Sequence, residues 1–166
     1  FKFQFSDPAN NLGDYILMRH EEMMLIKAEA MCMQGKYAQA RSIIETLMTE
    51  RDPNYNISSI ADANTLTISD ANGPTTPGSG SATLLDEIIL QRRIELWGEV
   101  GRIMDIKRLK TGFSRNFEGT NHPDRLLSRN TLDPEYPDFV MSIPQSEFDG
   151  NNNMDESIDQ NPWADN

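Results

Sequence analysis

Apolar residues recur at three- and four-residue intervals in two stretches near the start of the chain, which is the spacing of an amphipathic helix. The first stretch predicts a helix over residues 15–33, and the second predicts one over residues 37–51. Gly35 occupies the position of a left-handed C-terminal cap between them, and Pro53 ends the second helix. Helices joined by so short a turn form an αα-hairpin. Its predicted core positions are Met23, Met24, Ala28, Met31 and Cys32, followed by Ala40, Ile43, Ile44, Leu47 and Met48.

The predicted hairpin has the residue spacing of one tetratricopeptide repeat, a glycine and a tyrosine followed by an alanine and a large apolar residue. Small side chains at Ala28 and Ala40 let the two helices approach closely. Only one such unit is clear in the sequence, so the pattern does not predict a regular array. The residues that fit the repeat are Gly35, Tyr37, Ala40 and Ile44.

Two further helices are predicted in the middle of the chain. Thr83 is the expected N-cap of a helix that runs from residue 83 or 84 to residue 99 or 100. Gly101 then marks a bend, and a shorter helix follows over residues 102–109. With the hairpin, these helices predict a mainly α fold with further packed helices, long irregular loops and a few short strands.

The remaining segments are polar and irregular. Residues 1–13 predict a short strand or extended arm that ends in a polar turn. Residues 52–82 predict a long polar loop insertion, which is either a solvated insertion or a loop that faces a ligand or partner. Short strands are expected at TLTIS, residues 65–69, and at FVMSIP, residues 139–144. Residues 145–163 have almost no apolar periodicity, so we expect them to cover the surface rather than to build core.

Residues 92–108, RRIELWGEVGRIMDIKR, alternate acidic and basic side chains among large apolar ones. On a continuous helix at about 100° per residue, the charges of residues 92–102 fall in one stripe roughly 80° wide. Trp97 lies on the apolar side and is therefore predicted to be core. The stripe and its continuation predict a structural ion-pair network of Arg92, Glu95, Glu99, Arg102, Asp105 and Arg108.

A catalytic interpretation of this stretch makes Glu95 and Glu99 the paired carboxylates of a glycosidase. Two acids at i and i+4 on one helix point the same way, whereas catalytic carboxylates flank a bond from different directions. Neighbouring arginines also keep both acids ionised, which is unsuitable for a general acid. Arginine forks meet carboxylates in two-point contacts, so the structural interpretation is favoured.

Composition excludes several kinds of partner. The chain has 166 residues and a formal net charge of −11, from 15 basic and 26 acidic residues. This balance argues against a nucleic-acid surface and against binding to anionic lipid. No apolar run approaches the roughly 20 residues that a membrane helix needs. The chain begins at FKFQF without a methionine, and we interpret it as a mature or excised piece of a longer protein.

Signals for catalysis or cofactor binding are weak. No phosphate-binding loop, nucleophile elbow, zinc-protease motif or cysteine pair is present, so no catalytic residue and no cofactor is predicted. Cys32 is the only cysteine and is expected to be a buried structural thiol. DGNNNMDESID, residues 149–159, has the oxygen density of a calcium loop but lacks its central glycine and final glutamate, so no metal site is predicted.

Three stretches, in order, resemble the C-terminal part of the SusD/RagB proteins, the surface nutrient-binding lipoproteins of Bacteroidetes. RHEEMMLIKAEAMCMQGKYAQA is similar to the family's R-x-x-E-x-x-L-x-x-A-E-A helix, and ILQRRIELWGEVGRIMDIKR to its E-R-x-x-E-L-x-x-E-G-x-R-x-x-D-L-x-R segment. MSIPQSEFDGNNN with QNPW is similar to the closing P-I-P-x-x-E-x-x-x-N and Q-N-P-G-aromatic signature. Departures from the family pattern occur at Gln91, Val100, Ser142 and Trp163.

The resemblance implies that residues 1–166 are the C-terminal helical portion of a larger protein without catalytic activity. Such a protein is anchored by a lipid to the outer face of the outer membrane. It acts with a SusC-like TonB-dependent porter and captures oligosaccharides or, in some members, peptides. Tyr55 and Trp163 are the aromatic residues of this piece that we expect to contact ligand. The alternative is a tetratricopeptide-like protein-interaction module with no part in nutrient import.

Overall fold

The computed structural model describes residues 5–10, 12–13, 17–67, 81–99, 102–111, 121 and 140–161. These residues are mainly helical, which confirms the predicted fold class. They belong to two compact units. The first comprises the described residues within Phe1–Thr65 and Thr76–Trp97, and the second those within Leu66–Thr75 and Gly98–Asn166.

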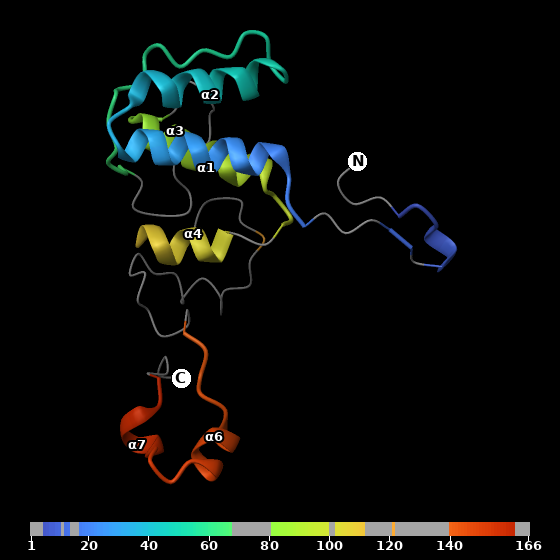
Figure 1. The fold of residues 1–166 in the computed structure, drawn as a ribbon, viewed down its shortest axis with the longest axis vertical. Coiled ribbons are helices and arrows are strands. Elements are labelled where there is room, and N and C mark those ends of the chain that lie inside the picture. Colours follow the sequence, from blue (N-terminus) through green and yellow to red (C-terminus); the bar gives the residue numbers. More distant parts are fainter. Residues whose placement is uncertain are drawn as a thin grey trace. The chain divides into compact units, whose positions relative to one another are not determined.

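The first unit is built on an αα-hairpin, as predicted. Helix α1, His20–Met33, packs against helix α2, Tyr37–Thr49, and also against helix α3, Leu84–Glu95 (Figure 1). Gly35 joins α1 to α2 at a φ of 73°, a backbone conformation that glycine adopts without strain. The amides of Gly35 and Lys36 donate to the carbonyls of Cys32 and Met31, which are the two bonds of a Schellman cap.

Helix α1 begins five residues later than predicted. Leu17 and Met18 precede it and are largely exposed, at 86% and 67%. Arg19 is the N-cap and has an extended backbone, with a φ of −118° and a ψ of 151°. Its side chain reaches the last residue of α3, and this long-range contact accompanies the late start of the helix.

The buried side of the hairpin differs in part from the predicted one. In α2 the predicted stripe is confirmed apart from Ile43, which is half-buried, and the helix ends at Thr49 rather than at residue 51. In α1 the prediction that Met23 is core is wrong, and the predicted core residues Met24 and Met31 are only half-buried, because the face that meets α2 and α3 is a different one. The buried residues of α1 are Leu25, Ala28 and Cys32.

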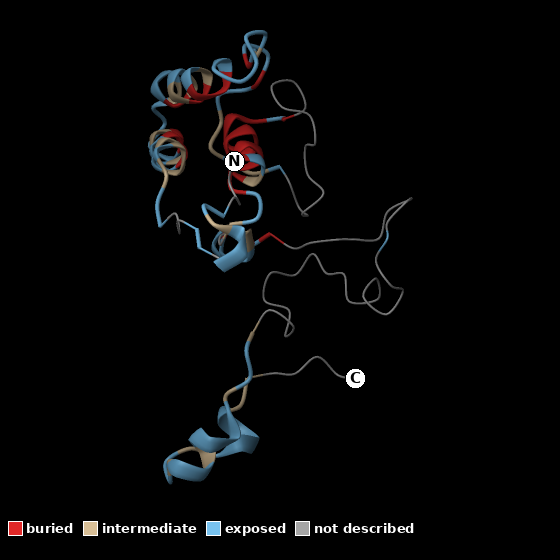
Figure 2. Ribbon diagram, turned by 90° about the vertical axis from the view of Figure 1, so that its right-hand side faces the viewer, coloured by how far each residue is buried: buried red, intermediate tan, exposed pale blue. Residues whose placement is uncertain are grey.

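Helix α3 lies in the core of the first unit and is buried over most of its length (Figure 2). Its start is confirmed, since the Thr83 hydroxyl accepts from the Asp86 amide while the Asp86 carboxylate accepts from the Thr83 amide. These reciprocal bonds form a capping box, which satisfies amides that have no partner inside the helix.

The predicted end of α3 is wrong, because the helix stops at Glu95 instead of continuing to residue 99 or 100. The chain turns through residues 96–98, and Gly98 has a φ of 77°, outside the helical region. Gly101, the predicted junction, lies outside the described residues. Helix α4, Arg102–Leu109, in the second unit has the predicted bounds.

The described part of the predicted loop, residues 52–67 and 81–82, is attached to the helices. Ile57 and Ile60 are buried among the core residues of the first unit. Ala61 forms a parallel bridge with Thr83, and the Thr83 hydroxyl donates to the carbonyl of Thr65 at 2.8 Å. The strand expected at residues 65–69 is absent from its described part, residues 65–67.

The described residues near the two ends of the chain, 5–10, 12–13 and 140–161, include no buried residue. Asp7 and Leu12 exchange backbone hydrogen bonds around the 3₁₀ turn η1, Pro8–Asn10, which confirms the predicted polar turn. Near the other end are helices α6, Gln145–Gly150, and α7, Glu156–Asp159. Neither contains a buried residue, as predicted for this segment, although its helices were not expected.

The strand predicted at FVMSIP is wrong for the described residues 140–144, which belong to no strand. Their backbone pairs with side chains instead of a neighbouring strand. The Gln160 amide donates to the carbonyl of Ile143 at 3.1 Å and accepts from its N–H at 2.8 Å, and Asn161 donates to the carbonyl of Met141 at 2.7 Å. The closing Q-N pair therefore fastens the segment that precedes α6.

Candidate functional site

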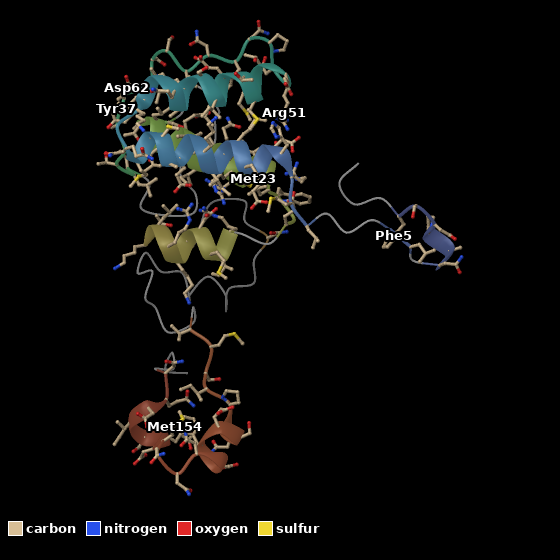
Figure 3. The ribbon with its side chains drawn as sticks, in the orientation of Figure 1. Phe5, Met23, Tyr37, Arg51, Asp62 and Met154 are labelled. Carbon is tan, nitrogen blue, oxygen red and sulfur yellow. The ribbon has the colours of Figure 1, made fainter. Side chains whose placement is uncertain are left out.

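Glu95 joins the ends of three helical segments in the first unit. Its Oε1 accepts from Arg19 Nη1 at 2.6 Å, and its Oε2 accepts from Arg51 Nη2 at 2.9 Å. Arg19 Nη2 also donates to the main-chain oxygen of Glu95 at 2.7 Å. Glu21 lies 3.6 Å from Arg19 and 3.9 Å from Arg51. We call these four residues the Glu95 cluster; Figure 3 labels Arg51 at one end of the hairpin.

Two side chains of the Glu95 cluster are largely buried, and the other two are partly exposed. The side chains of Glu95 and Arg19 are 9% and 14% exposed, whereas those of Glu21 and Arg51 are 33% and 43% exposed. Both carboxylate oxygens of Glu95 are occupied by guanidinium groups, so neither is directed at a substrate. The cluster can hold helix ends together, and Arg19 also places a positive charge at the C-terminal end of α3, where the helix dipole is negative.

The prediction of one continuous charged stripe over residues 92–102 is wrong. Because α3 ends at Glu95 and Glu99 follows the turn, these two acids are not on one helix. In the second unit, Asp105 accepts from Arg108 at 2.9 Å within α4. The structural role assigned to Arg92, Glu95, Glu99, Arg102, Asp105 and Arg108 remains a prediction, now with its members in two units.

A second polar cluster surrounds Glu87, which is fully buried on α3. Its Oε1 accepts from the Tyr55 hydroxyl at 2.6 Å and from the Gln91 amide at 2.7 Å. Its Oε2 accepts from the Ser81 hydroxyl at 2.7 Å. Tyr55 and Ser81 lie near the two ends of residues 52–82, so this Glu87 cluster fastens both ends of that segment to one carboxylate.

Tyr55, one of the two predicted ligand-contacting residues, is half-buried in this cluster. Burial, together with its hydrogen bond to Glu87, raises the pKa of the Tyr55 phenol far above its ordinary value. The hydroxyl is therefore a proton donor to Glu87 at any physiological pH. Trp163, the other predicted residue, lies outside the described residues.

Arg41 on α2 anchors the segment that follows the hairpin. Its guanidinium donates to the carbonyls of Ile57 and Ile60 and pairs with the Asp62 carboxylate at 2.7 Å. Sequence analysis did not single out Arg41. A charged residue beside a predicted apolar stripe was the only signal for it.

Two further predictions concern single residues. The prediction that Trp97 is core is wrong, since it is 71% exposed where the chain leaves α3. Cys32 is buried as predicted, and burial, followed by the charges of Glu29 and Asp62, raises the pKa of its thiol to about 11. A thiol with so high a pKa is a poor nucleophile at neutral pH.

The described residues contain no group of three or more histidine, cysteine, aspartate or glutamate side chains placed to hold a metal ion. Among the helices of the same residues, none has the length and apolar character needed to cross a membrane. The two clusters on α3 join elements of the protein to one another. The helices therefore form a scaffold in which these two clusters hold helix ends and loop ends together.

Comparison with known proteins gives one clear result. No curated protein and no solved structure matches the chain. The family described as the SusD family matches residues 2–163, nearly the whole chain. This range includes the Glu95 and Glu87 clusters and the closing Q-N pair. The chain belongs to the SusD family.

Proposed function

We propose that the protein containing this chain binds oligosaccharides and takes part in their uptake together with a SusC-like TonB-dependent porter. Members of the SusD family are binding proteins associated with nutrient uptake at the outer membrane. The observation that carries the proposal is the family match over residues 2–163. The same scaffold could instead bind peptides. Titration with each class of ligand distinguishes peptide binding from oligosaccharide binding.

Within that protein, we propose that this chain supplies scaffold rather than chemistry. Glu95 and Glu87 each accept from side chains of separate segments, which supports a role in holding helices and loop ends in place. The charged residues of α3 and α4 contribute to the same role. The location that fits this function is the outer face of the outer membrane, where a lipid on the full-length protein provides the anchor.

Ligand contact within this chain is assigned to Tyr55 and Trp163. The hydrogen bond from Tyr55 to Glu87 fixes the orientation of the phenol ring, and an aromatic ring that is held in place loses little freedom when a sugar stacks on it. Tyr55 is half-buried, and the part of this residue that remains exposed is the surface proposed to meet the sugar.

The test is to purify the full-length protein from its native outer membrane and to identify the co-purified proteins by mass spectrometry. A β-barrel porter in near-equal amount supports the proposal. Calorimetric titration with neutral oligosaccharides and with peptides then identifies the class of ligand. Absence of a porter together with absence of binding to either class would overturn it.

The second candidate is an interaction module based on the hairpin. It is favoured by the tetratricopeptide-like turn, in which Gly35 has the left-handed φ that the pattern requires. A pull-down that returns soluble regulators and no porter would place this candidate first.

A further inference from the structure

The first turns of helix α1 carry an imidazole and two thioether sulfurs at neighbouring positions of the helix surface. His20 is the first residue of α1, and Met23 and Met24 follow it three and four positions later. Residues at these spacings have Cβ atoms about 5–6 Å apart. Long side chains on a helix lean toward its N-terminal end, which directs both methionines toward His20. Figure 3 labels Met23 on α1.

Met18 adds a third thioether from the segment that enters the helix. Arg19 is the N-cap and has the extended backbone typical of that position. Met18 and Met23 therefore hold the positions called N′ and N4, whose apolar side chains commonly pack against each other at the start of a helix. We call Met18, His20, Met23 and Met24 the soft-donor group.

The soft-donor group is accessible from solution. Met18 is 67% exposed and Met23 is 45% exposed. His20 is also exposed, and Met24 is half-buried. No residue in the described part of the chain forms a hydrogen bond or an ion pair with the His20 imidazole. An imidazole that the fold does not use thus lies beside accessible thioethers.

The chemistry of these donors selects a soft metal ion. Thioether sulfur favours Cu⁺, and imidazole binds copper as well. Ca²⁺ and Mg²⁺ require oxygen donors, and Zn²⁺ sites combine imidazole with thiolates or carboxylates. Glu21, a carboxylate of the same turn, lies instead against Arg19 at 3.6 Å and Arg51 at 3.9 Å. The available donors therefore fit Cu⁺ better than these divalent ions.

The charges near the soft-donor group allow a cation to bind. The N-terminal end of a helix is partly positive, but Glu21 and Glu22 lie in the first turn of α1 and offset that charge. Lys27 is one turn further along the helix and exposed, so solvent and salt screen its charge. The net charge of −11 also attracts cations to the protein as a whole.

We propose that the soft-donor group is a binding site for one Cu⁺ ion per chain. His20 supplies the nitrogen donor and the methionines supply sulfur. The ion joins the segment before α1 to the first turns of the helix. The site consists of α1 and the residues that enter it, so the proposal is independent of nutrient uptake.

The test is a titration of the 166-residue chain with Cu⁺, followed by nuclear magnetic resonance. The ion is kept reduced by ascorbate in oxygen-free buffer. Cu⁺ has no unpaired electron, so it shifts signals without paramagnetic broadening. The chain has nine methionines and two histidines, so ¹³C-labelled methionine methyl groups and ¹⁵N-labelled imidazoles can be followed one by one. One equivalent should shift the signals of all four residues of the soft-donor group, and Zn²⁺ at the same concentration should leave the methyl signals in place.

The affinity for Cu⁺ is measured by competition with the coloured chelator bicinchoninate. His20→Gln should weaken binding at least about tenfold, because residues that only support a metal ligand already change affinity by about 10–100-fold. Met23→Leu should also weaken it about tenfold, although leucine keeps the volume of the side chain. The matched control is Met33→Leu, which makes the same change at a 55% exposed methionine of the same helix and should leave the affinity unchanged.

Three results would overturn the proposal. In the first, one equivalent of Cu⁺ shifts Met31 and Met33 but not His20, which would make Cys32, the residue between these methionines, the copper ligand. In the second, His20→Gln and Met23→Leu are folded by circular dichroism and bind Cu⁺ as tightly as the unsubstituted chain. In the third, the signals of all exposed methionines shift together without saturation, which would show non-specific binding.

Discussion

Glu87 and Glu95 lie eight residues apart on α3, about two turns, and both are buried, but different kinds of group hold them. Glu87 accepts from two hydroxyls and an amide, whereas Glu95 accepts from two guanidinium groups. The neutral donors around Glu87 hold loop ends near the N-terminal end of α3. The arginines around Glu95 hold helix ends together at the C-terminal end of α3. One helix thus serves two kinds of junction, which should respond differently to the same substitution.

The largest effect is expected for Glu95→Gln. An amide keeps the shape of the side chain but leaves the Arg19 and Arg51 charges without their counter-charge. Breaking a buried ion pair typically costs about 3–5 kcal/mol, and the 43% exposure of Arg51 places this case lower, at about 2–3 kcal/mol. Chemical denaturation followed by circular dichroism measures it. A loss under about 0.5 kcal/mol would show that Glu95 does not hold the helix ends together.

Glu87→Leu is expected to cost about 2 kcal/mol, because it leaves the donors of Tyr55, Ser81 and Gln91 without their acceptor. Glu87→Gln is the matched control. Its amide can accept from Tyr55 and donate to Ser81, so its cost should stay below about 1 kcal/mol. If Glu87→Gln and Glu95→Gln lower the free energy of unfolding by the same amount, the neutral donors of one cluster and the charged donors of the other do not make the two clusters respond differently.

Tyr55→Phe is expected to cost about 1 kcal/mol near neutral pH, the net contribution of one hydrogen bond. The folded-state pKa of Tyr55 is raised above its unfolded value, so this stabilisation is present in full below about pH 10 and is lost as the pH rises further. Stability of the unsubstituted protein should therefore fall more steeply than that of Tyr55→Phe in alkaline denaturation series. Parallel curves above pH 10 would show that the phenol is not bound to Glu87.

The smallest effect is expected for Ser81→Ala, about 0.5 kcal/mol, since Glu87 retains its bonds from Tyr55 and Gln91. A double-mutant cycle with Tyr55→Phe sharpens the comparison. The two losses should not add, because both hydroxyls bind the same carboxylate. Strict additivity in thermal unfolding would mean that the two ends of residues 52–82 are held independently.

Local signals in the sequence predicted local structure well. The turn at Gly35, the capping of α3 at Thr83 and the bounds of α4 follow from residues close together in the chain. The end of α3 was predicted too late, because Glu95 to Val100 has adequate helix spacing and the left-handed backbone at Gly98 overrides it. The exposure of Trp97 follows from that same turn.

The clusters could not be predicted in the same way. Arg19 and Glu95 are 76 residues apart in the sequence, and Tyr55 and Glu87 are 32 apart. No periodicity connects residues at such separations, so the charged stretch was predicted to join its helix to neighbouring helices, but the partner residues on those helices were not identified. The family resemblance identified Arg19 and Glu95 as parts of two motifs but not as partners of one another.

The hydrogen bond between Thr65 and Thr83 has a consequence for how this protein can change over evolution. It holds the two ends of residues 66–82 close to one another. Doubling the length of a closed loop costs only about 0.6 kcal/mol in chain entropy. Insertions between Thr67 and Ser81 should therefore cost the hairpin little stability, so new sequence can be added there while the hairpin stays intact.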